Sequence, residues 1–114
     1  MTTPATVLII DDEMDSCILW KAFLSQLNFK VFTALTLQEG MKLVDTVKPE
    51  IIFLDNNLPD GLGWEQLDVI QAKLPHCKVN LVSAYHFDPA RWLRKNVNVL
   101  AKPLTLSHIR ALLA

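Results

Sequence analysis

The chain alternates short apolar runs with longer stretches in which apolar residues recur every three or four positions. Four of the short runs are almost continuously apolar and rich in β-branched side chains, which is typical of strands covered on both faces of a parallel sheet. A further run, residues 30–33, alternates in polarity and is expected at a sheet edge. The predicted strands are residues 7–10, 30–33, 51–54, 79–82 and 97–100.

Three predicted helices lie between the first four strands, and each has a boundary signal. Asn28 is able to adopt the left-handed conformation that ends the first helix. Thr36 and Glu39 form a capping-box pattern for the second helix, and Pro49 blocks its continuation. The apolar residues that share an inner face are Trp20, Phe23, Leu24 and Leu27 in the first helix, Leu37, Met41, Val44 and Val47 in the second, and Leu67, Ile70 and Leu74 in the third.

Two more helices are predicted in the C-terminal part of the chain. Asp88 and Pro89 form a cap and first-turn proline for a short fourth helix over residues 89–95, and Thr105 caps a fifth. Five strands alternating with five helices predict a doubly wound α/β fold with a five-stranded parallel sheet. No linker, repeat or low-complexity segment interrupts the pattern, so we expect one domain over residues 1–114.

Composition narrows the possible functions. With 114 residues, of which 51% are hydrophobic, the chain can bury one sizeable core without disulfide or metal staples. The net charge is -1 and no long run of either sign occurs, so neither nucleic acid nor a membrane is expected as a partner. Cys17 and Cys77 are interpreted as incidental buried thiols. The apolar run at residues 7–10 is too short for a signal peptide, so a cytoplasmic location is expected.

Polar residues follow four of the predicted strands at their carboxyl ends. These residues are Asp11 and Asp12 after the first strand, Asp55 after the third, Ser83 after the fourth and Lys102 after the fifth. Because ligands of doubly wound sheets bind beyond the carboxyl ends of the strands, we expect these side chains to lie on one rim. Each residue alone has an ordinary explanation in helix capping or turn formation, so the hypothesis rests on their combination.

Three carboxylates and one lysine on this rim would carry a net charge of about -2. Such a cluster either raises the pKa of a carboxyl group or recruits a divalent cation. Carboxylate and carbonyl oxygens with room for water suit Mg²⁺, which often completes its coordination with phosphate oxygens. The sequence therefore predicts a magnesium site that tolerates an incoming phosphoryl group.

Five segments together resemble the receiver domains of two-component response regulators, including the chemotaxis regulators. They are Val7-Leu8-Ile9-Ile10-Asp11-Asp12-Glu13, Pro49-Glu50-Ile51-Ile52-Phe53-Leu54-Asp55, Leu58-Pro59-Asp60-Gly61-Leu62-Gly63, Ser83-Ala84 and Lys102-Pro103. The resemblance covers almost the whole chain. It implies a flavodoxin-like fold with the strand order 2-1-3-4-5.

The same resemblance implies the role of each residue on the rim. Asp55 would be the phosphoacceptor, and Asp12, Asp55 and the backbone carbonyl of Asn57 would bind Mg²⁺, while Asp11 holds metal-bound water. Ser83 and Lys102 would each contact a phosphoryl oxygen, or Lys102 would pair with Asp55 before phosphorylation. The physical chemistry agrees, because phosphoryl transfer needs an in-line nucleophile and positive charge on the transferred oxygens.

The resemblance also implies the partners. A sensor histidine kinase or a histidine phosphotransfer protein would donate the phosphoryl group, and a protein that the sequence does not identify would receive the signal. The domain would promote its own phosphorylation and slow dephosphorylation without turning over a separate substrate, so it is not expected to be an enzyme.

Two features depart from the usual receiver pattern. Val99 occupies the position of an aromatic residue whose ring moves when the receiver is phosphorylated, with Tyr85 or Phe87 as possible substitutes. The predicted fourth helix, residues 89–95, is also short.

These departures keep an alternative open, namely a pseudo-receiver that acts as a phosphate-independent protein-interaction module. A third class, the aspartyl-phosphate hydrolases of the haloacid dehalogenase type, requires an aspartate two residues after the nucleophile. Asn57 stands at that position.

Overall fold

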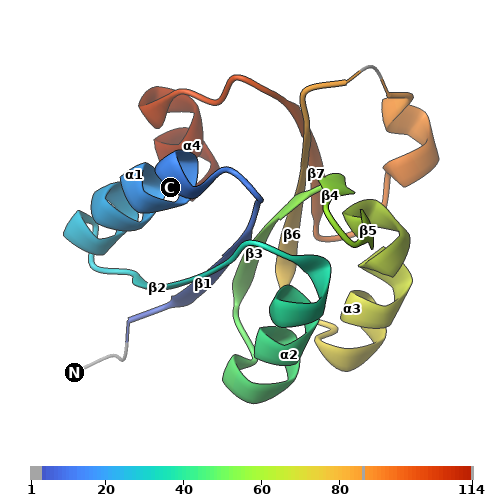
Figure 1. The fold of residues 1–114 in the computed structure, drawn as a ribbon, viewed down its shortest axis with the longest axis horizontal. Coiled ribbons are helices and arrows are strands. Elements are labelled where there is room, and N and C mark those ends of the chain that lie inside the picture. Colours follow the sequence, from blue (N-terminus) through green and yellow to red (C-terminus); the bar gives the residue numbers. More distant parts are fainter. Residues whose placement is uncertain (1–3, 86, 114) are drawn as a thin grey trace.

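The computed structural model describes residues 4–85 and 87–113 and contains a five-stranded parallel sheet (Figure 1). Its strands are β1 (Thr6–Ile10), β2 (Lys30–Ala34), β3 (Ile51–Asp55), β6 (Lys78–Ser83) and β7 (Val97–Ala101). They lie in the order β2-β1-β3-β6-β7, and all four pairings are parallel. Since β6 and β7 are the fourth and fifth strands of this sheet along the chain, the predicted order is confirmed, as is the edge position of β2.

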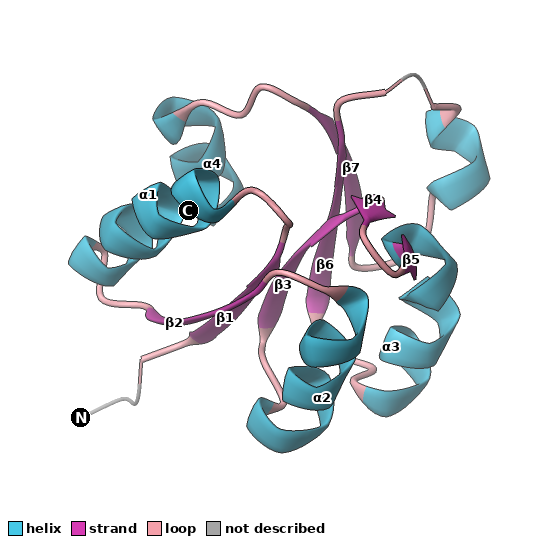
Figure 2. Cartoon of the chain, viewed as in Figure 1, coloured by secondary structure: helices cyan, strands magenta, loops and turns pink. Residues whose placement is uncertain are grey.

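Helices cover both faces of the sheet, as Figure 2 shows. The helices are α1 (Met14–Gln26), α2 (Leu37–Val47), α3 (Leu67–Lys73) and α4 (Leu106–Leu113). Helices α1 and α4 pack on one face, while α2 and α3 pack on the other. None of the helices in the described ranges has the length and apolar character needed to cross a membrane.

Alternate residues of each central strand enter the two halves of the core. On β1, Leu8 and Ile10 pack beneath α2 and α3, whereas Val7 and Ile9 pack beneath α1 and α4. This division explains why the central strands are continuously apolar, because each side chain meets a helix whichever way it points.

The predicted helix boundaries depend on a few polar residues. Thr36 Oγ1 accepts a hydrogen bond of 3.1 Å from the Glu39 amide at the start of α2. Asn28, with φ 71°, follows α1, and Lys48, with φ 52°, ends α2 just before Pro49. Thr105 Oγ1 accepts a hydrogen bond of 3.1 Å from the His108 amide at the start of α4. These local signals were therefore sufficient to place three of the helices.

The prediction of a fourth helix over residues 89–95, and so of five helices, is wrong. The segment forms only a single 3-10 turn, η2 (Pro89–Trp92), after which the chain is extended at Leu93. The start signal is present, because Asp88 Oδ1 accepts a hydrogen bond of 3.1 Å from the Ala90 amide. A start signal alone does not extend a helix, because most helical stability in a protein comes from packing of an apolar face. Instead, the Trp92 ring packs edge-on against Trp64 at a centroid distance of 5.4 Å.

The loop after β3 has more structure than the predicted turn. It forms a two-stranded antiparallel hairpin of β4 (Asn57–Leu58) and β5 (Gly61–Leu62), followed by the 3-10 turn η1 (Gly63–Gln66). Pro59 and Asp60 form the tip of this hairpin. The chain therefore leaves the end of β3 in a defined conformation, and this loop is the one that borders the rim.

A pair of asparagines connects the last three strands of the sheet. Asn80 on β6 is only 2% exposed, and its side-chain amide donates a hydrogen bond of 3.3 Å to the Ile52 carbonyl on β3. Asn98, opposite Asn80 on β7, donates a hydrogen bond of 3.1 Å to Asn80 Oδ1. The buried amide thus has a partner for both its donor and its acceptor atoms.

Candidate phosphoacceptor and metal site

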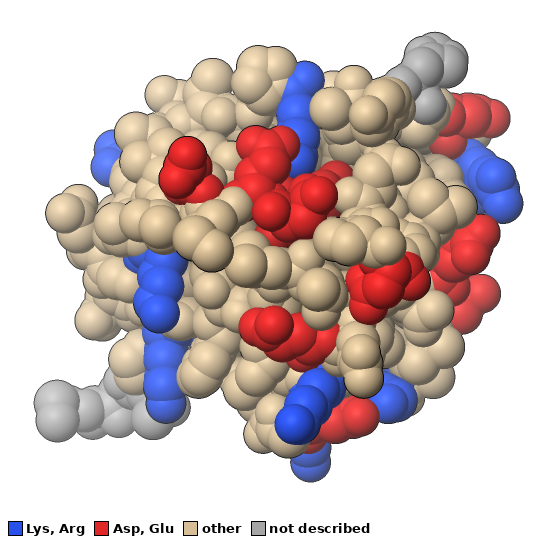
Figure 3. Space-filling view, in the orientation of Figure 1, with Lys and Arg blue, Asp and Glu red and all other residues tan. Residues whose placement is uncertain are grey.

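The parallel register brings the predicted carboxylates together at the carboxyl ends of β1 and β3. Asp11 directly follows β1, and Asp55 is the last residue of β3. Oxygen atoms of Asp11, Asp12 and Asp55 lie within 4.8 Å of one another. Asp11 and Asp55 are buried, whereas Asp12 is exposed, so the cluster opens to solvent on one side. Figure 3 shows acidic side chains gathered at the upper centre of the molecule, with a basic side chain reaching them.

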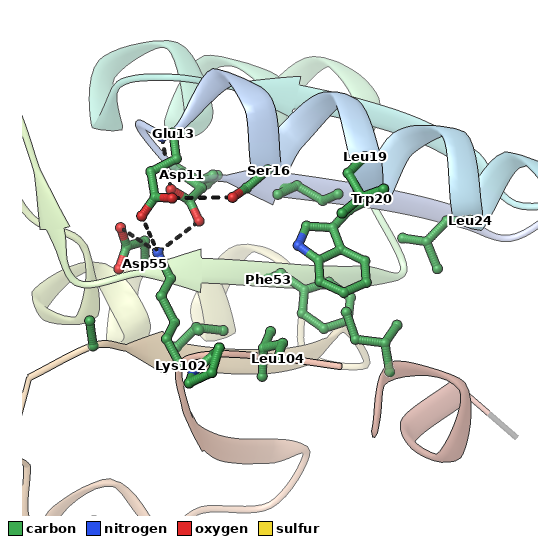
Figure 4. Close-up of a pocket in the computed structure, with 16 residues that line it drawn as sticks. Asp11, Glu13, Ser16, Leu19, Trp20, Leu24, Phe53, Asp55, Lys102 and Leu104 are labelled. Atoms are coloured by element: carbon green, nitrogen blue, oxygen red, sulfur yellow. Dashed lines mark hydrogen bonds and ion pairs between the residues drawn. The ribbon is translucent and has the colours of Figure 1, made fainter. Parts of the chain in front are cut away.

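Lys102 reaches this cluster from the end of β7, on the far side of β6. Its Nζ lies 3.0 Å from Asp11 Oδ2 and 3.5 Å from Asp55 Oδ2 (Figure 4). The Lys102 backbone amide donates a hydrogen bond of 2.9 Å to the Ser83 carbonyl, which fixes the start of the side chain beside β6. The ammonium group therefore bridges two carboxylates, and its shorter contact is with Asp11 rather than with the predicted partner Asp55.

Glu13 is a member of the site to which the sequence pattern assigned no role. Its Oε1 lies 3.5 Å from Lys102 Nζ, and its Oε2 accepts a hydrogen bond of 3.2 Å from the Ser16 hydroxyl. The one feature of the sequence that could have indicated this is the position of Glu13 directly after Asp11-Asp12. The contact itself joins residues 89 positions apart, so local sequence does not reveal it.

The surroundings raise the pKa of the predicted phosphoacceptor. Burial raises the pKa of the Asp55 carboxyl from 3.8 to about 6; the Lys102 charge opposes this rise, and the Asp11 charge adds to it. Burial alone lowers the pKa of the Lys102 ammonium, but the hydrogen bond and charge of Asp11, with the charges of Asp55 and Glu13, raise it overall. At neutral pH the lysine is therefore charged and Asp55 is mainly an ionised carboxylate held in an unfavourable environment.

Ser83 and Asn57 are the remaining residues of the predicted site. Ser83 ends β6, beside β3, and is 2% exposed. Its hydroxyl accepts a hydrogen bond of 3.1 Å from the Tyr85 amide, so it also shapes the turn after β6. Asn57 lies two residues beyond Asp55, at the start of β4, and is exposed. Its role as a carbonyl ligand stays a prediction.

Asn56 and Trp64 hold the loop that follows Asp55. The Asn56 carbonyl accepts a hydrogen bond of 2.8 Å from the Gly63 amide, and its side-chain Oδ1 accepts one of 3.2 Å from the Trp64 amide. The buried Trp64 indole donates a hydrogen bond of 3.0 Å to the Leu54 carbonyl, next to Asp55 in sequence. These contacts close the loop at its base and fix the backbone on both sides of Asp55.

Val99 and its two possible substitutes, Tyr85 and Phe87, differ in how far they are buried. Val99 is half-buried against the α2 and α3 side of the core. The Phe87 ring meets Trp64 edge-on at a centroid distance of 5.2 Å, whereas Tyr85 is 68% exposed. Of the two proposed substitutes, Phe87 is the one that contacts the loop after Asp55 through Trp64.

The remaining candidate side chains lie outside the cluster. His76 and His108 are exposed, and His86 lies outside the described residues. Cys17 and Cys77 are free and buried. Burial raises the pKa of Cys17 to about 11 and that of Cys77 to about 12, so both thiols stay protonated at neutral pH.

The three-carboxylate cluster fits a hard divalent cation. Opposite oxygens of an octahedral Mg²⁺ site lie about 4 Å apart, so oxygens already within 4.8 Å need only small side-chain adjustments. A cavity of about 420 Å³ opens beside the cluster, between α1 and the segment after β7 (Figure 4). Asp11, Asp55 and Lys102 lie at one end of this cavity, and apolar side chains such as Trp20 and Phe53 line the rest.

Comparison with known proteins agrees with this geometry. Residues 7–114 match the sequence profile of the response regulator receiver domain. The chain is 30% identical over 110 residues to the response regulator protein PilR of Pseudomonas aeruginosa, covering 94% of this chain and 25% of PilR. It is 38% identical over 79 residues to the chemotaxis protein CheY of Listeria monocytogenes, covering 68% of this chain and 66% of that protein.

A solved structure of a two-component response regulator from Clostridium difficile superimposes with a TM-score of 0.86 at 26% identity. The match covers 96% of this chain and 92% of the other. The chain thus belongs to the family of response regulator receiver domains. It spans a quarter of the length of PilR, so PilR contains much that this chain does not represent.

Proposed function

We propose that this receiver domain accepts a phosphoryl group on Asp55 during two-component signal transduction. The observation that carries the proposal is the position of the Asp55 carboxylate. It is buried, lies in a cluster with two further aspartates, and has the Lys102 ammonium 3.5 Å away. Its pKa of about 6 leaves it ionised, and thus nucleophilic, at neutral pH.

The proposed transfer needs one bond to form and one to break. An Asp55 carboxylate oxygen forms a bond to phosphorus while the bond between phosphorus and the donor imidazole nitrogen breaks. The electron pair of that bond stays on the imidazole nitrogen, which takes up a proton. Lys102, which bridges Asp11 and Asp55, is proposed to pair with a phosphoryl oxygen on Asp55.

The metal-binding roles follow from the donor set. Asp12 and Asp55, with the Asn57 carbonyl, are proposed to hold Mg²⁺ directly, and Asp11 is proposed to orient metal-bound water. When bound, Mg²⁺ supplies positive charge that offsets the carboxylates and the transferred oxygens. Ser83, buried at the end of the neighbouring strand, is proposed to donate its hydroxyl to a phosphoryl oxygen.

A sensor histidine kinase or a histidine phosphotransfer protein is the proposed donor, and the proposed location is the cytoplasm. The domain is proposed to promote its own phosphorylation and slow autodephosphorylation, as a signalling module rather than an enzyme with a separate substrate. Asn57 argues against a phosphate-ester hydrolase, because an amide at this position is not a general acid.

The second candidate function is a pseudo-receiver that binds a protein without phosphorylation. Two observations favour it: Val99 has no ring to move, and the described residues between β6 and β7 form the short 3-10 turn η2 and no α-helix. Both features affect how a phosphorylated state would be transmitted. Neither affects the side chains that surround Asp55.

The test is to incubate the protein with Mg²⁺ and a small-molecule phosphodonor and to measure its intact mass. We expect one phosphoryl adduct on the parent protein, and none on Asp55→Asn or without Mg²⁺. Asp45→Asn is the matched control, because Asp45 is an exposed residue of α2 paired with Lys73, and it should be phosphorylated like the parent.

Absence of an adduct on the folded parent protein, with a kinase-derived phosphohistidine donor as well, would favour the pseudo-receiver. An equal adduct on Asp55→Asn would show that another residue accepts the phosphoryl group.

A further inference from the structure

Helix α2 begins with its free amides held by two different residues. Thr36, the residue before the helix, accepts a hydrogen bond from the Glu39 amide through Oγ1. Asp60, 23 residues from Leu37 in sequence, accepts hydrogen bonds from the Leu37 amide at 2.7 Å and from the Gln38 amide at 2.9 Å. Both carboxylate oxygens are used, and such charge-assisted bonds are stronger than neutral ones. Thr36 accepts from the Glu39 amide alone, so the acceptors for the Leu37 and Gln38 amides come from a different part of the chain, which Asp60 thereby ties to α2.

Asp60 lies at the tip of the hairpin that follows the phosphoacceptor. The pairs Asn57–Leu62 and Leu58–Gly61 form its short ladder. At the base of the hairpin, the Asn56 carbonyl accepts the Gly63 amide hydrogen bond. The hairpin is thus held at its base next to β3 and at its tip by α2, and Asn57 lies between these two points.

The hairpin has little other support on its outer side. Both residues of β5 are exposed, with Leu62 at 46%, and only Leu58 is buried in the core. Two-stranded hairpins are marginally stable without further packing. The attachment of Asp60 to α2 therefore limits how far the hairpin can pivot about its base.

We propose that Asp60 is a positioning residue that, by clamping the hairpin tip to the start of α2, holds the Asn57 carbonyl where it binds the metal ion. This inference rests on the proposed function, since it concerns the same metal site. The two hydrogen bonds also lower the pKa of Asp60, so the carboxylate stays ionised at neutral pH and keeps both contacts.

The experiment is a calorimetric titration with Mg²⁺ alone, comparing the parent protein with Asp60→Ala, Asp60→Asn and Thr36→Ala. Residues that orient metal ligands typically change metal affinity by about tenfold or more, so Asp60→Ala should weaken Mg²⁺ binding about tenfold. Asp60→Asn keeps a neutral acceptor oxygen and should lie between the two. Thr36→Ala removes the other cap of the same helix without touching the hairpin, so its affinity should equal that of the parent.

Amide hydrogen exchange without metal gives a second readout. Exchange in residues 57–62 should accelerate in Asp60→Ala and stay unchanged in Thr36→Ala. Should Asp60→Ala fail to fold, Asp60→Asn is compared with Thr36→Ala in both measurements.

The possible outcomes distinguish failure of the positioning role from failure of the proposed function. Parent-like Mg²⁺ affinity in Asp60→Ala would overturn the positioning role and leave Asp60 as a helix cap. Equal weakening in Thr36→Ala would also overturn it, because the effect would then come from α2 itself. A folded parent protein that binds no Mg²⁺ would instead contradict the proposed function.

Discussion

Replacing Asp55 by asparagine is expected to stabilise the metal-free domain by about 2–3 kcal/mol at pH values above 6, because the pKa of Asp55 is raised from 3.8 to about 6. A carboxyl group with a raised pKa in the folded state binds protons more tightly there than in the unfolded chain. The cost of ionising it in the folded state therefore builds up as the pH rises from 3.8 to about 6 and is constant above that. Asparagine has a similar shape and carries no charge to bury.

The measurement is denaturant unfolding of the parent and Asp55→Asn across pH. The gain should be nearly complete above about pH 6, shrink as the pH falls, and vanish below pH 3.8, where the carboxyl becomes protonated in the unfolded chain as well. Saturating Mg²⁺ should also reduce it, since an ion that binds only the folded parent stabilises that protein alone. As a control, Asp45→Asn should change the unfolding free energy by less than about 0.5 kcal/mol. A gain of the same size at pH 3.8 would contradict the electrostatic explanation.

Gly63→Ala is expected to destabilise the domain by about 3 kcal/mol or more, at the upper end of overpacking effects. A Cβ atom at this position would lie 2.2 Å from the backbone carbonyl oxygen of Asp55 and 3.0 Å from Leu54 Cδ1. Because the nearest atom belongs to the backbone of the proposed phosphoacceptor, relief of the clash requires that β3 or η1 shift. We therefore expect slower phosphorylation in addition to reduced stability.

Gly40→Ala provides the matched comparison. A Cβ atom at Gly40 would lie 2.6 Å from Ile10 Cδ1, so it is also crowded, but its neighbour is a side chain. Both γ branches of Ile10 lie within 3.0 Å, so α2 has to shift slightly, but the higher helix propensity of alanine offsets part of this and should limit the loss to about 1–2 kcal/mol. Both variants are measured by denaturant unfolding and by phosphodonor labelling. A smaller loss for Gly63→Ala than for Gly40→Ala would show that the loop after Asp55 is not tightly fixed.

The parts of the fold that the sequence predicted are those with local signals. The continuous apolar runs located β1 and β3, and Thr36 with Glu39 located the start of α2, because these patterns depend on neighbouring residues. The strand order followed from the family resemblance and not from the pattern of polarity. Knowledge of the strand ends was then enough to predict that Asp11, Asp55 and Lys102 would meet.

What the sequence did not predict depends on residues far apart in the chain. The short η2 turn in place of a fourth helix reflects packing of Trp92 on Trp64, which no local propensity encodes. Attachment of Asp60 to α2 and the contact of Glu13 with Lys102 are likewise tertiary contacts. The sequence predicted that Lys102 lies in the carboxylate cluster, but it did not predict that Asp11 is the nearest carboxylate.

The asparagine pair in the sheet has a consequence for how β7 aligns with its neighbour. Asn98 supplies the hydrogen bond that Asn80 Oδ1 receives, and Asn80 is buried beside Ile52. If β7 slipped by one residue along β6, the Asn98 side chain would point to the opposite face of the sheet, and Asn80 Oδ1 would lose its hydrogen-bond donor. An unsatisfied buried acceptor costs about 1–3 kcal/mol, a penalty that apolar side chains at these positions would not impose. The asparagine pair thus favours one register of β7 against β6. Lys102 directly follows β7, so its contact with Asp55 depends on that register.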